Sequence, residues 1–198
     1  MAIKIAPDGE ILIKGNNVFS AYHNDEKATK AALVDGWFHT GDIGDLDEQG
    51  FLKITGRKKE LLITAGGKNV APAVLEDRLR AHPLVSQCIV VGDQRPFIGA
   101  LITLDAQMLT SWAKNHSLPS LSFEDARTND VVRAELARAV EAANKAVSKP
   151  ESIRKFTILA GDFTEKNGYL TPSLKLKRNM VMKDYAGEVE ALYSGSRR

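Results

Sequence analysis

The sequence has little of several features that mark particular classes of protein. Its 198 residues include one cysteine, Cys88, which excludes a disulfide framework and a multi-cysteine metal site. No apolar run approaches the roughly 20 residues that span a bilayer, and the first residues are not typical of a signal peptide. A net charge of +2 excludes a strongly basic nucleic-acid-binding protein. These absences favour a cytoplasmic protein, with peripheral association with a membrane left open.

Metal-binding and phosphate-loop patterns are also absent. The histidines are scattered without the spacing of metal ligands, so no metal site is expected. A phosphate-binding loop ending at Lys68 would need glycine at position 62 and serine or threonine at position 69, where Leu62 and Asn69 stand. Cys88 lies in an apolar run, which favours a buried structural thiol over a nucleophile.

What is present is typical of a globular chain with 43% hydrophobic and 26% charged residues. The first third predicts short strands at residues 10–14, 37–40 and 51–54, the last two joined by an acidic turn at 47–50. A helix capped by Asn24 or Asp25 is expected to run to about Val34. Residues 57–60 form a charged break, where we expect a domain boundary.

After the break, strand and helix patterns alternate, which indicates an α/β domain. Strands are expected at residues 61–63, 85–91, 98–104 and 152–159, and a flexible turn at 65–69. Helices are expected at residues 72–81, 130–147 and 177–193. Pro72 suits the first turn of a helix, where its missing N–H would have no partner anyway.

Three segments carry residues suited to binding or catalysis. In residues 36–42, the carboxylate of Asp42 follows a Thr-Gly turn and could accept hydrogen bonds from a diol such as ribose. A carboxylate that only caps the turn is the alternative. In residues 57–59, three successive cations suit either an anionic ligand or a solvated linker.

Two further patterns point to a ligand close to the backbone. Gly66 and Gly67 would let a thin ligand approach the chain, or would form an ordinary turn. In residues 168–178, Lys175 stands among leucines after the stiffening Pro172. Its ammonium could be delivered to a phosphate or carboxylate in a dry site, or could belong to a basic surface turn.

Together, in this order, the segments resemble one family, the AMP-forming acyl-CoA synthetases of the adenylate-forming superfamily. The motifs are G-W-F-x-T-G-D, G-R-K-K-E-L and T-P-S-L-K-L-K-R, and the resemblance extends from Gly9 to the region of Lys175. The last motif is similar to that of the long-chain fatty-acid–CoA ligases. The resemblance implies an α/β (α+β) chain. Residues 1–57 would be the last β-rich subdomain of the large AMP-binding domain, and residues 58–198 a small mobile C-terminal lid domain, a short sheet flanked by helices.

The resemblance also implies an activity and its partners. The intact enzyme would activate a long-chain fatty acid with ATP and Mg²⁺ to acyl-AMP, and would then form acyl-CoA with coenzyme A. The ATP loop and the magnesium ligand of the family precede the region that this chain resembles. We therefore expect the chain to depend on an upstream N-terminal domain of the same protein and to be inactive alone.

Residue roles follow from the same resemblance. Asp42 and Arg57 would contact the ribose of the nucleotide, and Lys59 would be the hinge between the two domains. Lys175 would be the catalytic lysine of adenylation. The tunnel for the pantetheine arm of coenzyme A would be lined at Gly66 and Gly67.

Two other functions stay open at this point. A fatty-acyl-AMP ligase would pass the acyl group to a carrier protein instead of coenzyme A. The features expected to separate these two enzymes lie in the N-terminal domain. Alternatively, the chain could act as a non-catalytic lid or interaction fragment.

Overall fold

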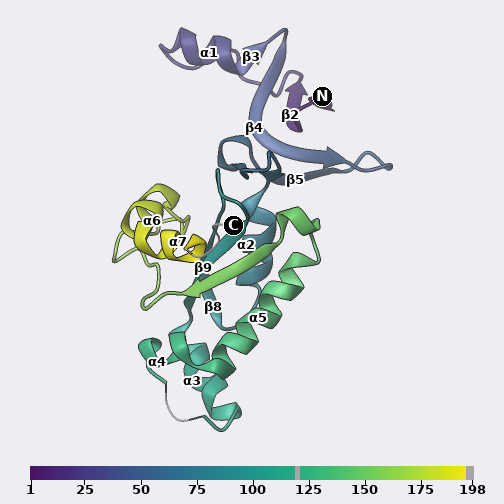
Figure 1. The fold of residues 1–198 in the computed structure, drawn as a ribbon. Coiled ribbons are helices and arrows are strands. Elements are labelled where there is room, and N and C mark those ends of the chain that lie inside the picture. The colour runs from purple at the N-terminus through teal and green to yellow at the C-terminus, as the bar shows by residue number, and fades with distance from the viewer. Residues whose placement is uncertain (119–120, 195–198) are drawn as a thin grey trace. The chain divides into compact units, whose positions relative to one another are not determined.

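The computed structural model describes residues 1–118 and 121–194, which form a mixed α/β structure (Figure 1). The expected fold class is therefore confirmed. The chain divides into two compact units, Met1–Leu61 (unit 1) and Leu62–Arg198 (unit 2). The boundary expected between residues 57 and 58 falls slightly before this division and stays a prediction.

Unit 1 is built on an antiparallel sheet in the order β1-β2-β4-β3, with β5 paired to β4. Its strands are β1 (Ala2–Ile5), β2 (Glu10–Lys14), β3 (Leu33–Val34), β4 (Trp37–Leu46) and β5 (Leu52–Arg57). Its helices are α1 (Glu26–Ala32) and the short 3₁₀ helix η1 (Lys58–Glu60). Because β2 lies between β1 and β4, its residues Glu10, Ile11 and Leu12 are buried.

Helix α1 begins as the sequence predicts and ends slightly earlier. Asp25 is the cap, and its Oδ1 accepts a hydrogen bond from the N–H of Ala28 at 2.8 Å. The helix ends at Ala32 rather than near Val34, because Leu33 and Val34 pair with β4 instead. Tertiary strand pairing therefore overrides the local helix pattern.

The hairpin of β4 and β5 confirms the predicted acidic turn and corrects the lengths of its strands. Oδ1 of Asp47 accepts hydrogen bonds from the N–H groups of Gln49 and Phe51 at 2.9 and 2.8 Å. Strand β4 continues to Leu46, at the acidic turn, and β5 continues to Arg57, at the charged segment, so both are longer than expected. The glycines and aspartates inside β4 are not typical of strands, so the sequence pattern does not predict this extension. They still belong to the strand, because its pairing needs only backbone hydrogen bonds. Arg57 therefore ends a strand instead of opening the charged break.

Unit 2 contains a three-stranded sheet in the order β10-β9-β8. Its strands are β8 (Val85–Val91), β9 (Ile98–Leu104) and β10 (Ile153–Ile158), with β6 (Leu62–Ile63) and β7 (Asn69–Val70) forming a separate pair. Its helices are α2 (Pro72–Arg80), α3 (Ala106–Asn115), α4 (Phe123–Thr128), α5 (Asp130–Asn144), η2 (Lys149–Glu151), α6 (Arg178–Asp184) and α7 (Ala186–Tyr193). Strand β9 runs antiparallel to β8 and parallel to β10.

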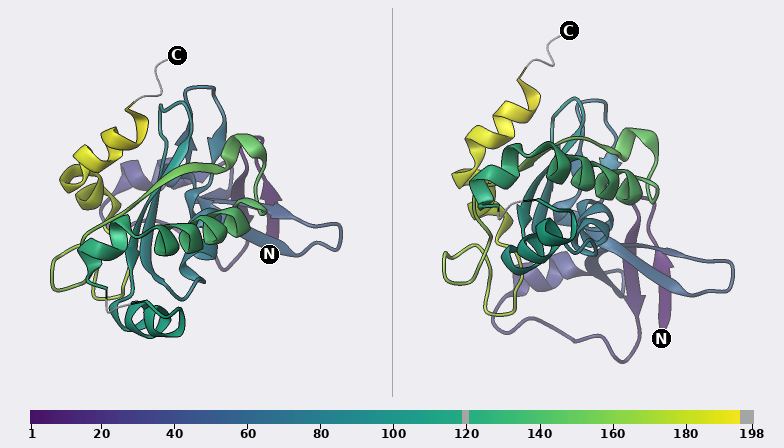
Figure 2. Two further views of the ribbon diagram at one scale, coloured as in Figure 1. Left: turned by 60° about the horizontal axis from the view of Figure 1, so that its bottom comes forward. Right: turned by 90° about the horizontal axis from the view of Figure 1, so that it is seen from below.

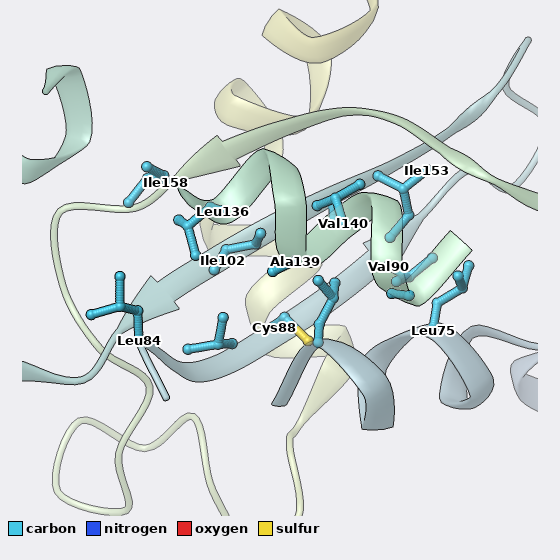
Figure 3. Close-up of a cluster of buried hydrophobic side chains, with 14 of the residues drawn as sticks. Leu75, Leu84, Cys88, Val90, Ile102, Leu136, Ala139, Val140, Ile153 and Ile158 are labelled. Atoms are coloured by element: carbon cyan, nitrogen blue, oxygen red, sulfur yellow. The ribbon is translucent and has the colours of Figure 1, made fainter. Parts of the chain in front are cut away.

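The central strand β9 is buried along its whole length, and the two faces of the sheet have separate cores. Ala100 and Ile102 belong to the core that α2 and α5 cover, whereas Leu101 belongs to the core that α6 and α7 cover. Figure 2 shows the green helix α5 lying across the sheet. In Figure 3, Leu136 and Val140 of α5 approach Ile102 and its neighbours. Both layers of helices therefore depend on this one strand.

The strands and helices expected from residue 72 to 159 are confirmed for α2, β8, β9, α5 and β10, within a few residues at their ends. The strand expected at residues 61–63 begins at Leu62. Asn69, expected in the flexible turn, begins β7, because it pairs with Ile63 through the backbone. Helices α3 and α4 were not expected. The buried side chains are Leu109 and Ala113 in α3 and Ala126 in α4.

The C-terminal helix expected at residues 177–193 is instead two helices, α6 and α7, which meet at Tyr185. The ring of Tyr185 packs against Phe163 and Tyr169, with centroids 5.5 and 5.7 Å apart. The break therefore accompanies packing against residues distant in sequence, and neither proline nor a run of glycines marks it in the sequence.

We expect Leu136→Ala to lower the free energy of unfolding by about 2–5 kcal/mol, because it leaves a cavity in the core under α5. Val131→Ala is the matched control, since Val131 lies on the same helix and is 41% exposed. Urea unfolding followed by circular dichroism measures both. Equal midpoints for the two variants would contradict this description of the core.

Candidate functional site

Asp42 and Arg57 lie opposite each other on the paired strands β4 and β5. Nε of Arg57 is 3.0 Å from Oδ1 of Asp42, with the side chain of Asp42 26% exposed and that of Arg57 63% exposed. The structure thus brings together two residues that are distant in sequence. Both side chains reach solvent, so a ligand could contact them.

The turn before Asp42 is fixed by its backbone and by one hydroxyl. Gly41 has a φ of +71°, a conformation that favours glycine. Oγ1 of Thr40 donates a hydrogen bond to the carbonyl of Ile11 at 2.7 Å and accepts one from the N–H of Asp42 at 3.0 Å. This turn therefore explains Thr40 and Gly41, and it holds the backbone from which the carboxylate of Asp42 projects.

A buried carboxylate that the sequence reading missed holds the same turn. Oε1 of Glu10 accepts a hydrogen bond from the N–H of Gly41 at 2.9 Å. Its Oε2 lies 2.9 Å from Nζ of Lys58 and 3.0 Å from Nδ1 of His39. Nζ of Lys58 also lies 2.7 Å from Oδ2 of Asp8. We call Asp8, Glu10, His39 and Lys58 the Glu10 clamp. An acidic residue next to two buried apolar positions of a strand was the only sequence signal for it.

The pKa values within the Glu10 clamp follow from burial and charge pairing. Burial raises the pKa of Glu10, but hydrogen bonds from Lys58, His39 and Gly41 outweigh it and lower that pKa below its ordinary 4.5. Lys58 lowers the pKa of Asp8, and hydrogen bonds to Asp8 and Glu10 raise the pKa of Lys58 above 10.5. The two carboxylates contribute stability that is fully present above their unfolded pKa values. This stability is lost as the pH falls through their lower pKa values in the folded protein. Lys58 contributes stability that is fully present below its unfolded pKa. This stability is lost as the pH rises through the higher pKa of Lys58 in the folded protein.

Lys59 lies in η1, immediately after the Glu10 clamp. Together with Arg57 and Lys58 it lines a hollow of about 720 Å³ within unit 1, whose other walls include His39 and Tyr22. Arg57, Lys58 and Lys59, the three successive cations of the sequence, thus all line this hollow. The side chain of Lys59 is exposed.

Gly66 and Gly67 form a tight exposed turn in unit 2. The N–H of Gly67 donates to the carbonyl of Thr64 at 2.8 Å, and the N–H of Ala65 donates to that of Arg95 at 2.9 Å. Gly67 has a φ of +76°, so its conformation favours glycine. Gly66 does not have a positive φ, and a Cβ added to it would meet only Oγ1 of Thr64, at 3.9 Å. Packing within the described part of this chain therefore does not require glycine at position 66.

Lys175 lies at the tip of a narrow turn in unit 2 and its side chain is exposed. Its carbonyl accepts a hydrogen bond from the N–H of Thr171 at 2.9 Å, and its N–H donates to Oγ1 of Thr171 at 3.0 Å. Leu170 and Leu176 form a β-bridge below this tip. The ammonium is therefore presented to solvent from a braced backbone.

No group of three or more histidine, cysteine, aspartate or glutamate side chains that could hold a metal occurs within residues 1–118 and 121–194. Nor does this part of the chain contain a helix with the length and hydropathy of a membrane span. Cys88 is fully buried, and burial raises the pKa of its thiol to about 12. The interpretation of Cys88 as a structural thiol is confirmed.

We expect Glu10→Gln to lower the stability of unit 1 by about 2 kcal/mol at neutral pH, because Lys58 and Gly41 lose a charged acceptor. The variant should also lose less stability than the wild type as pH falls from about 6 to 3, since one lowered carboxyl pKa is gone. The chain has two tryptophans, so fluorescence of Trp37 in a Trp112→Phe background reports unfolding of unit 1. Glu48→Gln, at the exposed hairpin turn, is the control. Identical pH profiles for the two variants would argue against the clamp.

Comparisons with known proteins extend over nearly the whole chain. The family model for the AMP-binding enzyme C-terminal domain matches residues 59–197. The long-chain-fatty-acid–CoA ligase FadD15 of Mycobacterium tuberculosis is 56% identical over 194 residues, which are 98% of this chain and 32% of that protein. The chain thus spans about a third of the length of the curated relative that it matches.

Solved structures share the fold. O-succinylbenzoate coenzyme A synthetase from Bacillus subtilis, in complex with ATP and magnesium ion, has a TM-score of 0.60 and 30% identity, covering 90% of this chain and 33% of that one. The A domain of carboxylic acid reductase from Segniliparus rugosus has a TM-score of 0.74 over 99% of this chain and 31% of that one, but at 23% identity it shows the fold alone. Because the family match covers most of the chain, the resemblance is confirmed, and the chain belongs to the family of AMP-binding enzyme C-terminal domains.

Proposed function

We propose that this chain is the C-terminal part of an AMP-forming, ATP-dependent long-chain fatty-acid–CoA ligase. The observation that carries the proposal is the 56% identity to a ligase of that name over 98% of this chain. Working with ATP and coenzyme A, such a ligase would be cytoplasmic. It would need an upstream domain to supply the ATP loop and the magnesium ligand, so this chain alone would be inactive.

The reaction would proceed in two half-reactions. In the first, a carboxylate oxygen of the fatty acid attacks the α-phosphorus of ATP, the bond to the β-phosphate oxygen breaks, and pyrophosphate leaves. In the second, the deprotonated thiol of coenzyme A attacks the acyl carbon, the bond to the phosphate oxygen breaks, and AMP leaves. The first step needs a cation near the phosphate, and the second needs that space for a thiol.

Asp42 and Arg57 would bind the nucleotide ribose. The carboxylate of Asp42 is partly exposed and can accept hydrogen bonds from a diol, while Nε of Arg57, 3.0 Å from its Oδ1, holds its orientation. The Glu10 clamp would keep this pair in place, because it holds the preceding Gly41.

Lys175 would stabilise the charge that develops on the phosphate during adenylation. Its exposed ammonium at the tip of a braced turn supports this role, because the group is free to enter a site formed outside unit 2. Water excluded on closure would strengthen the interaction further.

A hinge at Lys59 would bring Lys175 to the phosphate for adenylation and withdraw it before thioester formation. The Glu10 clamp binds Lys58 to unit 1. In unit 2, the N–H of Ile63 donates to Oδ1 of Asp93 at 3.0 Å. Torsion changes would therefore be confined to the few residues between Lys58 and Ile63, which is what a hinge requires.

Gly66 would lie beside the pantetheine arm of coenzyme A in the second half-reaction. Packing within the described chain leaves room for a side chain at this position. A ligand that passes over the turn would explain why position 66 has no side chain.

The test uses a chimera in which this chain replaces the region that it matches in the M. tuberculosis ligase. We expect Lys175→Ala in this chimera to slow ATP–pyrophosphate exchange by about 10²–10³-fold, through loss of one electrostatic group. Thioester formation from supplied acyl-adenylate should change less than about twofold, since the ammonium has no role there.

Lys177→Ala is the matched control, because Lys177 is also exposed and lies just after the turn. It should leave both rates unchanged. Equal losses of both half-reactions in Lys175→Ala would contradict the role of Lys175. Supplying a carrier protein in place of coenzyme A separates this ligase from a fatty-acyl-AMP ligase.

We expect Gly66→Leu to leave pyrophosphate exchange unchanged and to slow thioester formation by at least about tenfold, because the side chain would narrow the path of a thin thiol arm. Gly187→Leu is the control, since a Cβ at Gly187 meets no atom within 4 Å and one at Gly66 meets only Oγ1 of Thr64, at 3.9 Å. If pyrophosphate exchange fell as far as overall turnover, position 66 would not belong to the coenzyme A path.

A further inference from the structure

The turn that carries Lys175 is held differently at its tip and at its base. At the tip, the hydrogen bonds between Lys175 and Thr171 fix the shape of the turn only. At the base, the N–H of Lys177 donates to the carbonyl of Tyr169 at 2.8 Å and closes the turn. These bonds lie within one segment, so they do not place the turn against the rest of unit 2.

The next residue, Arg178, reaches into the body of unit 2. Its Nη1 lies 2.5 Å from Oε1 of Glu76 in α2, and its Nη2 lies 2.8 Å from the carbonyl oxygen of Val90 in β8. The side chain of Arg178 is 20% exposed and that of Glu76 is 8% exposed. A largely buried ion pair thus joins the base of the turn to two elements about 90 to 100 residues earlier in the chain.

The pair also completes the edge of the sheet. Strand β8 is an edge strand, so outward backbone groups have no neighbouring strand there. The N–H of Val90 donates to Oε1 of Glu76 at 2.7 Å, and its carbonyl accepts from Arg178. Glu76 and Arg178 therefore occupy both backbone groups of one residue, much as a paired strand would. The guanidinium of Arg178 is therefore held by two acceptors, Oε1 of Glu76 and the carbonyl of Val90.

We infer that Arg178 is a positioning residue, which fixes the turn bearing Lys175 to α2 and β8 through Glu76 and Val90. Lys175 and Arg178 are three positions apart along the chain, so their Cα atoms are at most about 10 Å apart. The catalytic part of this inference rests on the proposed function of Lys175. Its structural part, anchorage of the turn, does not.

The chemistry of the pair favours positioning over stability. A buried ion pair contributes little net stability, because desolvation of both charges offsets their attraction. An arginine that donates to a carboxylate and a carbonyl from one planar group fixes direction, and a lysine could not reproduce that geometry. Since a misplacement of about 1 Å can cost roughly 10²-fold in rate, an exposed catalytic lysine needs such an anchor.

Backbone amide exchange of the chain tests the anchor directly. We expect Arg178→Met to accelerate exchange in residues 169–177 by at least about tenfold more than in β9, where exchange reports global unfolding. Because this variant leaves the carboxylate of Glu76 buried and unpaired, the double variant Glu76→Gln with Arg178→Met is measured beside it. The amide of glutamine can still accept from the N–H of Val90.

Arg80→Met is the matched control, since Arg80 forms an ion pair with Asp77 on α2 that is more exposed than the Glu76–Arg178 pair. It should leave exchange in residues 169–177 unchanged. Unchanged exchange in these residues in both Arg178 variants would overturn the inference. So would an equal acceleration in residues 169–177 and in β9, because Arg178 would then act only on global stability.

A double-mutant cycle in the chimera tests the link to catalysis. Arg178→Met should slow pyrophosphate exchange at least about tenfold and leave thiolysis of supplied acyl-adenylate within about twofold. In a Lys175→Ala background it should have no further effect on pyrophosphate exchange, because it acts through Lys175. A further slowing of similar size in that background would refute positioning.

The outcomes separate the two proposals. If Lys175→Ala leaves pyrophosphate exchange normal, the proposed function of Lys175 fails, whereas the amide exchange still decides whether Arg178 anchors the turn. If Lys175→Ala is inactive and Arg178→Met matches the wild type in both assays, the positioning role fails alone.

Discussion

A charged group that must reach a ligand cannot be held by burial, so its backbone has to be held instead. In its proposed role Lys175 meets this constraint, because its ammonium is exposed while the segment around it is bonded at the tip, at the base and through Arg178. The bond between Lys175 and Thr171 is exposed, whereas the bond between Arg178 and Glu76 is partly buried. An exposed side chain thus stands on a segment that Arg178 joins to α2 and β8.

Unit 1 solves the same problem with a different group. Asp42 is partly exposed, and the buried carboxylate of Glu10 holds the turn before it. The same carboxylate binds Lys58, so that the residues on either side of the expected hinge have defined attachments. In unit 1 the buried Glu10 binds the N–H of Gly41, next to Asp42, and in unit 2 the buried Glu76 binds the side chain of Arg178, near Lys175. Neither glutamate is part of the proposed chemistry.

Much of the fold follows from local patterns, and the exceptions have physical causes. The alternating apolar residues predicted β8 and β9, and the apolar face of α5 predicted that helix, because burial imposes those periods. The extension of β4 through Gly41 and Asp42 could not be predicted, since backbone pairing with a distant strand decides it. The break at Tyr185 likewise depends on rings that come from residues 163 and 169.

The sequence by itself determined the acidic turn at Asp47 and the elements α2, β8, β9, α5 and β10, because these depend on residue type and short spacing. Asp42, Arg57 and Lys175 were proposed as site residues from their resemblance to a family. Only the tertiary structure decided which charges are paired. Glu76 and Arg178 are 102 residues apart, and Glu10 and Lys58 are 48 apart. A lone glutamate in a strand or helix carries no sign of its partner. Burial of such a carboxylate becomes tolerable only when folding brings a cation and backbone N–H groups to it.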